Sequence, residues 1–400
     1  MRKVAGIDVH KAFLEVAYRL NENEISVSRI SYTMDGLTRL IKLAKRHMIT
    51  DVYIESTGNY YYPMYYALKG AGINVHVLNA YKTRRLDPNK TDKRDAIWLL
   101  KLGESNLFSG SYIPDDEMLA LRFLVREHFR LADRVGDFKR KLHSLLWRLG
   151  LYARDIVKNL RSKRKRRLLL AILRGQVDTS KLEDSDIKAI YNVLKRPTMR
   201  TYIAVVRIHL ESIEFLEKQL ENLDALIDCY AKKFEEQIRI LMSVPGISKI
   251  LAVGILAEIG DVSRFPDKNK LASYAGLVPT SRDSGGKRRR GKISKKSNKY
   301  LRRYMFLAAM AAMRSKSRRI RLIVERLRGR RKHFKIMVVA IARKLLTIIW
   351  FLLLTRKDVW REVGYSKRIR SKRYRGKFRI PIRVAIDVLR RAGYEVRKIA

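Results

Sequence analysis

The sequence predicts an α/β N-terminal domain built on a mixed β-sheet, followed by long coiled-coil helices and a mainly α-helical C-terminal domain. Three observations predict this order. Strand-like alternation of apolar residues opens the chain and is then interleaved with helical segments as far as about residue 110. Heptad spacing begins at Leu121, and a Pro-Gly turn at residues 245–246 introduces further apolar helices.

The first 110 residues contain short strands and helices. Segments 3–9, 12–18 and 24–30 alternate like strands joined by tight turns, which predicts an antiparallel meander. The segments expected to follow are a helix at 35–47, a strand at 51–55, a helix from about residue 60, a strand at 73–78 and a helix from Thr91. Such an order is typical of a mixed sheet covered by helices, here over residues 1–110.

Two heptad seams predict long helices between residues 115 and 240, which pair with each other or with a second subunit. The first seam consists of Leu121, Leu124, Leu131, Val135, Phe138, Leu142, Leu145 and Leu149. The second consists of Val206, Ile213, Leu216, Leu220, Leu223, Ile227, Tyr230 and Phe234. A basic linker at 150–205 separates them, and its run "RSKRKRR" fits a solvated loop and a phosphate-binding segment equally well.

The C-terminal domain is expected at residues 241–355. Helix, Pro-Gly turn and helix over 241–265 resemble a helix-hairpin-helix unit, which can hold a phosphate, although such turns also join ordinary helices. Segment 336–355 is long enough to span a membrane, but two cations near its middle favour a core helix. The tail at 356–400 has eight cations and no acid between Lys367 and Arg379, which predicts nonspecific affinity.

The charge of the chain predicts a polyanionic partner. There are 88 basic and 39 acidic residues, a net charge of +49, yet the 46% hydrophobic content is sufficient for packed domains. Nucleic acid is the expected partner. The opening "MRKVAGIDVH" lacks an apolar signal segment, so we expect a cytoplasmic protein, associated with the nucleoid when DNA is bound, and no membrane partner. The single cysteine, Cys229, excludes internal disulfides and multi-cysteine metal sites.

Four acids stand where strands or helices begin or end. Asp8 ends the first predicted strand, Glu55 ends the fourth, and Asp92 and Asp95 lie in the first turn of a helix, three residues apart on one face. If the two strands are neighbours, the four carboxylates converge and suit two hard divalent cations, Mg²⁺ first and Mn²⁺ as the other choice. Each acid taken alone also has a structural explanation, because acids in a first helical turn complement the helix dipole.

Several motifs resemble one family. "GIDVHK", "IESTGNY" and "KTDKRDA" resemble the N-terminal domain of the IS110 family transposases, which has an RNase H-like (RuvC-like) fold and a DEDD tetrad. "SVPGISKILAVGILAEIGDVSRF" and "LASYAGLVPTSRDSGGKRRRGKISKKSNKYLR" resemble the second domain of that family, in the expected order within residues 1–315. The resemblance implies that Asp8, Glu55, Asp92 and Asp95 are the tetrad, and that Ser284 is the nucleophilic serine. It also implies a structured noncoding bridge RNA that chooses both DNA sites by base pairing.

Ser284 precedes two glycines, so its backbone can approach DNA closely, and the cations that follow can neutralise a phosphate. Ser-Gly-Gly is more often a simple turn, and Ser281 is a rival hydroxyl that only the family motif rejects. "GKRRRGKI" mimics a P-loop, but Ile293 replaces the magnesium-binding hydroxyl, which excludes ATP binding. The residues expected to contact nucleic acid are Lys90, Lys93, Arg94, Arg161, Lys163, Arg164, Lys165, Arg166, Arg167, Lys287, Arg288, Arg289, Arg290, Lys292, Lys295 and Lys296.

Three functions fit these features. The first is a recombinase that moves its own insertion element by cutting and rejoining donor and target DNA. The second is a RuvC-type, metal-dependent junction nuclease without a protein nucleophile, and the third is a noncatalytic nucleic-acid-binding protein. For the recombinase we expect a homo-oligomer, a dimer that pairs into a tetramer, because synapsis joins two DNA duplexes.

Overall fold

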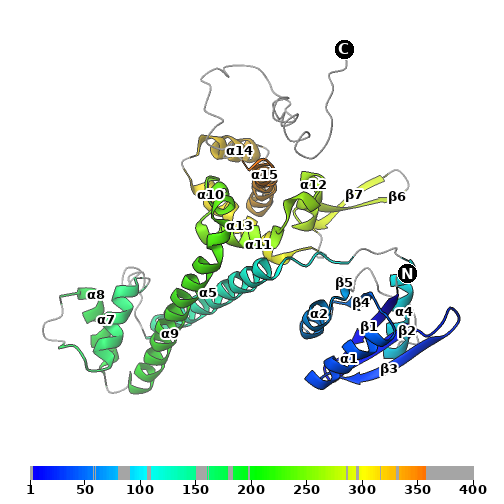
Figure 1. Cartoon of the computed structure of the whole chain (residues 1–400). Helices are drawn as coiled ribbons and strands as arrows, with labels where there is room; N and C mark the ends of the chain where they lie inside the picture. Colours follow the sequence, from blue (N-terminus) through cyan, green and yellow to red (C-terminus); the bar gives the residue numbers. More distant parts are fainter. Residues whose placement is uncertain are drawn as a thin grey trace, which may run out of the picture. The chain divides into compact units, whose positions relative to one another are not determined.

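The computed structural model divides into two compact units, residues 1–113 and 114–400 (Figure 1). For residues 280–296 it describes only the backbone of two strands. The described residues are 3–56, 58, 60–79, 91–105, 110–149, 160, 162–178, 183–196, 199–284, 287–293, 297–315, 317–329 and 333–356. The basic tail therefore lies outside the described residues.

The N-terminal unit is a five-stranded mixed sheet in the order β3-β2-β1-β4-β5, which confirms the predicted sheet. The strands are β1 (Val4–Val9), β2 (Phe13–Arg19), β3 (Ile25–Ser31), β4 (Asp51–Glu55) and β5 (Asn74–Leu78). The helices described in this unit are α1 (Met34–Arg46), α2 (Tyr61–Gly70) and α4 (Asp92–Ser105). The central strand β1 is antiparallel to β2 and parallel to β4, so the predicted strand ends with Asp8 and Glu55 are neighbours.

The two faces of this sheet are covered by different helices (Figure 1). Ala5, Ile7 and Val9 of β1 are buried in one cluster with residues of α1 and α2. The alternate residues face α4, because a strand exposes successive side chains on opposite sides. Asp8, two residues after Gly6, therefore lies on the same face of the sheet as Gly6, which is the face that α4 covers.

Helix α4 lies unusually close to β1 because Gly6 has no side chain. A Cβ at Gly6 would be 2.2 Å from the backbone nitrogen of Leu100 and 2.3 Å from the carbonyl oxygen of Ala96. Gly103, further along α4, makes a similar approach to Val4 and Tyr53. The helix therefore runs antiparallel to β1, and its first residue reaches the strand end that carries Asp8.

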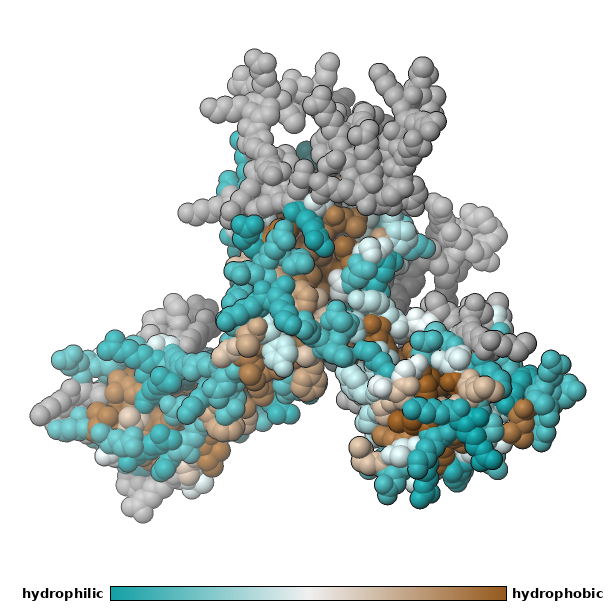
Figure 2. All heavy atoms as spheres, in the orientation of Figure 1, coloured by the Kyte–Doolittle hydropathy of each residue, from teal (hydrophilic) through white to brown (hydrophobic). Residues whose placement is uncertain are grey.

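The second unit begins with two long helices, α5 (Asp116–Arg148) and α9 (Arg200–Ala231). Leu121 and Val125 cluster with Ile227, whereas residues near the other end of α5 cluster with residues 206–213, so the helices pack antiparallel within the chain. The two predicted seams therefore meet each other, although Tyr230 is 45% exposed. Hydrophobic residues also reach the surface of this unit (Figure 2), among them Phe123, Ile208 and Phe215.

The segment predicted as a basic linker, 150–205, contains helices where the structure describes it. Residues 163–173 and 185–194 form helices α7 (Lys163–Leu173) and α8 (Ser185–Leu194). Leu169, Leu170 and Ile172 of α7 pack on the α5–α9 pair. The sequence interpretation took the five cations at the start of α7 for a linker, although six apolar residues follow them without interruption.

The remaining helices surround α15 (Phe334–Thr355), whose residues 338–353 contribute to the core of this unit. By length and composition α15 also passes the test for a membrane span, and half of its most apolar window is buried. The other described elements are α10 (Glu235–Met242), α11 (Lys249–Ile259), α12 (Lys268–Tyr274), α13 (Lys299–Arg314), α14 (Arg318–Gly329), three-residue 3₁₀ turns at 232–234 and 262–264, and strands β6 (Pro279–Ser284) and β7 (Lys287–Ile293).

The Pro-Gly turn joins α10 to α11 as predicted, but it packs against α13. Gly246 has φ of 90°, and a Cβ there would lie 2.4 Å from Ala308 O and Ala312 N. This turn thus forms a helix–helix contact, which does not support the expected phosphate-binding role of a helix-hairpin-helix unit.

Gly6→Ala is expected to destabilise the N-terminal unit by about 1–3 kcal/mol, because the added methyl group overpacks the α4 backbone. Urea unfolding of the full chain measures the change. Gly70→Ala is the matched control, since a Cβ there meets nothing within 4 Å. A Gly6→Ala protein as stable as the wild type would contradict the close approach of α4 to β1.

Candidate functional site

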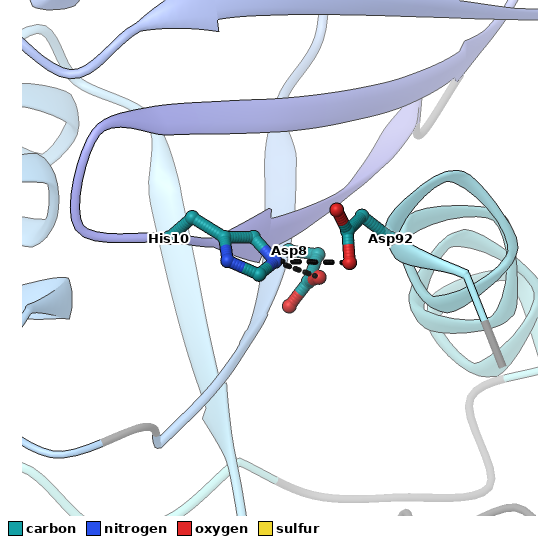
Figure 3. Close-up of side chains that lie close together, drawn as sticks. All are labelled: Asp8, His10 and Asp92. Carbon is teal, nitrogen blue, oxygen red and sulfur yellow. Dashed lines mark hydrogen bonds and ion pairs between the residues drawn. The ribbon is translucent and has the colours of Figure 1, made fainter.

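Asp8, His10 and Asp92 converge at one end of the sheet (Figure 3). The Nε2 atom of His10 lies 3.2 Å from Oδ2 of Asp8 and 3.1 Å from Oδ1 of Asp92. One ligand atom from each of the three residues lies within 4.8 Å of the others. The Asp8 side chain is only 17% exposed, whereas those of His10 and Asp92 are each 41% exposed. The group therefore has a buried side and an open side.

Local structure holds each of these three side chains. The backbone N–H of His10 donates to Phe13 O at 3.0 Å in the turn from β1 to β2, and the His10 ring stacks on that of Phe13 at 4.7 Å. Thr91 precedes α4, and its Oγ1 caps the first turn of the helix by accepting the Arg94 N–H at 3.4 Å. Asp92 then occupies the first position of the helix.

The other two predicted acids lie beside this group. Asp95 is one turn along α4 and raises the pKa of Asp8. Glu55 is the last residue of β4, and the pairing of Ile7 with Ile54 places it in the row next to Asp8. Both acids are half-buried. The structure thus brings Asp8 and Asp92 together directly and places Asp95 and Glu55 at the same end of the unit.

Burial raises the pKa of Asp8 above its usual 3.8; His10 lowers it, and the negative charges of Asp95 and Asp92 raise it further. The negative charges of neighbouring carboxylates repel one another, and a cation bound between them would offset this repulsion. Two carboxylate oxygens and one imidazole nitrogen form a donor set that could hold a divalent metal ion. The sequence interpretation missed His10, although it stands two residues after Asp8 in the same motif.

The cations expected to bind nucleic acid fall into four sets. Lys90, Arg161, Lys295 and Lys296 lie outside the described residues. Lys93, Arg94 and Arg164 are exposed, and the side chains of Lys287, Arg288, Arg289, Arg290 and Lys292 on β7 are not among those described. The remaining cations, on α7, have acidic partners.

The α7 cations pair with carboxylates, most of them on α9. Arg166 is 5% exposed and donates to Glu217 at 2.5 Å and to the Leu160 carbonyl at 2.9 Å. The other pairs are Lys163 with Glu221, Lys165 with Asp184, and Arg167 with Glu214. For Arg166 the expected phosphate contact is therefore corrected, because a buried guanidinium bound to a carboxylate stabilises the α7–α9 contact instead.

Ser284 is the last residue of β6 and pairs in register with Lys287, the first residue of β7. The base of this hairpin is held firmly. Gly276, just before β6, has φ of 65°, and the backbone N–H of Asn298, after β7, donates to Tyr274 O at 2.8 Å. Both ends of the serine-bearing segment are therefore fixed to α12.

Asn298 also joins the hairpin base to a buried ionic network. Its Oδ1 caps α13, and its Nδ2 donates to Oε2 of Glu258 at 2.7 Å. Glu258, at the end of α11, is 1% exposed and accepts two hydrogen bonds from Arg126 of α5, at 2.7 and 2.8 Å. Arg122 donates to the Ala257 carbonyl at 2.9 Å. One buried carboxylate thus links α5, α11 and α13.

Comparisons with known proteins agree with this architecture. Residues 238–325 match the family described as "Transposase IS116/IS110/IS902 family", and residues 5–150 match a "Transposase" family of the DEDD type named for IS110. The chain belongs to the IS110 family of transposases. The match over residues 5–150 includes the Asp8 site, and the match over residues 238–325 includes the Ser284 hairpin.

Three relatives show how sequence identity and coverage vary among the proteins similar to this chain. A probable family 20 transposase of Pseudomonas aeruginosa is 28% identical over 46% of this chain and 54% of its own length. The transposase for insertion sequence element IS1111A of Coxiella burnetii is 32% identical over 36% of this chain and 42% of its own. A pilin gene-inverting protein of Moraxella lacunata is 25% identical over 86% of this chain and 93% of its own. The chain thus spans about half the length of the first two.

Asp8→Asn is expected to raise the melting temperature at pH 7 in the presence of a chelator. The folded-state pKa of Asp8 is raised, so the folded protein binds this proton more tightly, and wild-type stability falls as the pH rises through that interval. The gain from Asp8→Asn should shrink as the pH is lowered toward 3.8. Thermal melts across this pH range test it, with exposed Asp35→Asn as a control that should show no gain.

Glu258→Ala is expected to lower the free energy of unfolding by about 3–5 kcal/mol, because Arg126 and Arg122 lose the carboxylate that they share in a buried site. Denaturant unfolding followed by circular dichroism measures the loss. Glu211→Ala, which removes exposed pairs with Arg207 and Arg174, should leave the midpoint unchanged. Equal midpoints for both variants would rule out a stabilising role for the network.

Proposed function

We propose that this protein is a recombinase that moves its own insertion element by cutting and rejoining DNA. The observation that carries the proposal is the convergence of Asp8 and Asp92 at the acidic end of a mixed sheet, in a chain of a transposase family. Asp8, Glu55, Asp92 and Asp95 would hold two Mg²⁺ ions, or Mn²⁺. When bound, such ions stabilise charge on a reacting phosphodiester and lower the pKa of an attacking hydroxyl.

In this proposal Ser284 is the nucleophile. Its Oγ forms a bond to phosphorus, and the bond from phosphorus to the leaving sugar oxygen breaks, so the strand end stays attached to the protein until rejoining. Lys287, its register partner, and the arginines that follow on β7 would neutralise the phosphate. The arginines supply charge but are poor bases, so the serine hairpin must meet a metal site, in its own subunit or in another.

The expected partners follow from charge and family. Donor and target DNA and a structured bridge RNA together would balance the net charge of +49. The gene-inverting name of the Moraxella relative describes a reaction in which DNA is cut and rejoined, which supports recombination over simple hydrolysis. A dimer that pairs into a tetramer remains the assembly that we propose for synapsis, acting at the nucleoid.

Asp8→Asn and Asp92→Asn should each abolish strand cleavage while leaving DNA and RNA affinity intact or improved, because a repulsive carboxylate charge is removed near the phosphates. Ser284→Ala should abolish the covalent protein–DNA adduct, whereas Ser281→Ala, the matched control on the same strand, should keep it. Denaturing gels of labelled DNA measure both outcomes.

Each alternative function predicts a different pattern. Cleavage that persists in Ser284→Ala but disappears in Asp8→Asn would identify a metal-dependent junction nuclease. Nucleic-acid binding with no cleavage by the wild type or any variant would identify a noncatalytic binding protein. An adduct on Ser281 would overturn the assignment of Ser284.

A further inference from the structure

Glu15, in the middle of β2, is fully buried yet only half satisfied. Its relative exposure is 0%. Oε1 accepts a hydrogen bond from Arg29 Nε at 2.6 Å, but Oε2 has no hydrogen-bond partner within the part of the chain that the structure describes. A buried carboxylate oxygen without a donor is costly, so a polar partner is expected there.

The register of the sheet places Glu15 beside the acidic site. Glu15 is directly opposite Asp8 in the β1–β2 ladder, and opposed residues in such a ladder are neighbours on one face, with Cβ atoms about 4.5–5.5 Å apart. The next pair on this face, Gly6 and Ala17, contacts α4. Glu15 therefore lies on the α4 side of the sheet, next to Asp8.

Glu15 is also connected to His10 through a stack of side chains. The Arg29 guanidinium lies 4.1 Å from the centre of the Phe13 ring, and that ring stacks on His10 at 4.7 Å. Arg29, on β3, is the register partner of Glu15 on the side away from Asp8. Arg29 thus pairs with Oε1, and Oε2 has no hydrogen-bond partner among the described residues.

We infer that Glu15 is a positioning residue for the divalent cation of this site, an inference that rests on the proposed metal-dependent function. It holds the cation's hydration shell: Oε2 accepts a hydrogen bond from water in that shell, while Asp8 and Asp92 provide the direct ligands. Mg²⁺ retains several of its waters in proteins, and carboxylates just outside the ligand shell orient them. Among the described residues of the sheet, only Glu15 is a fully buried acid with a carboxylate oxygen that has no hydrogen-bond partner.

Titration calorimetry of the metal-free full chain with MgCl₂ and MnCl₂ tests this inference. Glu15→Gln, which keeps one carbonyl oxygen for Arg29 but places an amide NH₂ at the other position, should weaken Mg²⁺ binding about 10–100-fold. Glu104→Gln, which alters an ion pair with Arg19 at the other end of α4, is the matched control and should bind normally.

Thermal melts separate the positioning role from a purely structural one. Because a neutral amide costs less to bury without a partner than a charged carboxylate does, Glu15→Gln should raise the melting temperature of the metal-free protein and reduce the increase that Mg²⁺ produces. A structural role alone predicts the reverse, a lower metal-free melting temperature and an unchanged increase with Mg²⁺, and that result would overturn the inference.

The outcomes also distinguish this inference from the proposed function. If the wild type binds Mg²⁺, Asp8→Asn abolishes binding and Glu15→Gln binds normally, the inference fails and the metal site stands. If the wild type does not bind either cation, the metal site itself fails. Should Glu15→Gln not fold, Glu15→Asp, which retains the charge but shortens the side chain, takes its place with the same expected loss of affinity.

Discussion

The N-terminal unit depends on one close contact, the approach of the α4 backbone to β1 at Gly6. A side chain there would collide with the helix, so the contact needs a residue without a Cβ. Because α4 runs antiparallel to β1, this contact fixes where the helix begins, and it brings Asp92 to the strand end that holds Asp8. The contact that fixes the geometry of the acidic site therefore lies at Ala96 and Leu100, at least one helical turn after Asp92.

The second constraint is electrostatic. In a chain with 88 basic residues, two of the three buried acids among the described residues pair with arginine: Glu258 with Arg126, and Glu15 with Arg29. Asp8 differs, because its titratable neighbours are His10 and two further aspartates. A protein with so many available cations that nevertheless gathers carboxylates at one strand end gains nothing in stability from that cluster, which favours a functional role for it.

The sequence was sufficient to predict the mixed sheet, its strand positions and the direct neighbours Asp8 and Asp92, because period-two alternation and strand-end acids are local signals. It did not reveal the roles of Glu15 or Glu258, because each depends on a residue that only the folded chain brings close. Glu15 lies opposite Asp8 in the strand register, and Glu258 accepts from Arg126, which is 132 residues away in the sequence. The burial of Arg166 was not predicted for the same reason, because its partner Glu217 on α9 is distant in sequence.

The serine hairpin and the acidic site differ in the structure that holds them in place. The acidic site is embedded in a sheet and held by a helix backbone. The hairpin is a two-stranded ribbon, but its base is anchored by Asn298 to Glu258 and through it to Arg126 of the long helix α5. A two-stranded ribbon alone is only marginally stable, so a rigid base limits the directions in which Ser284 can move. The hairpin base is thus linked to α5 through one buried ionic contact, that of Glu258 with Arg126.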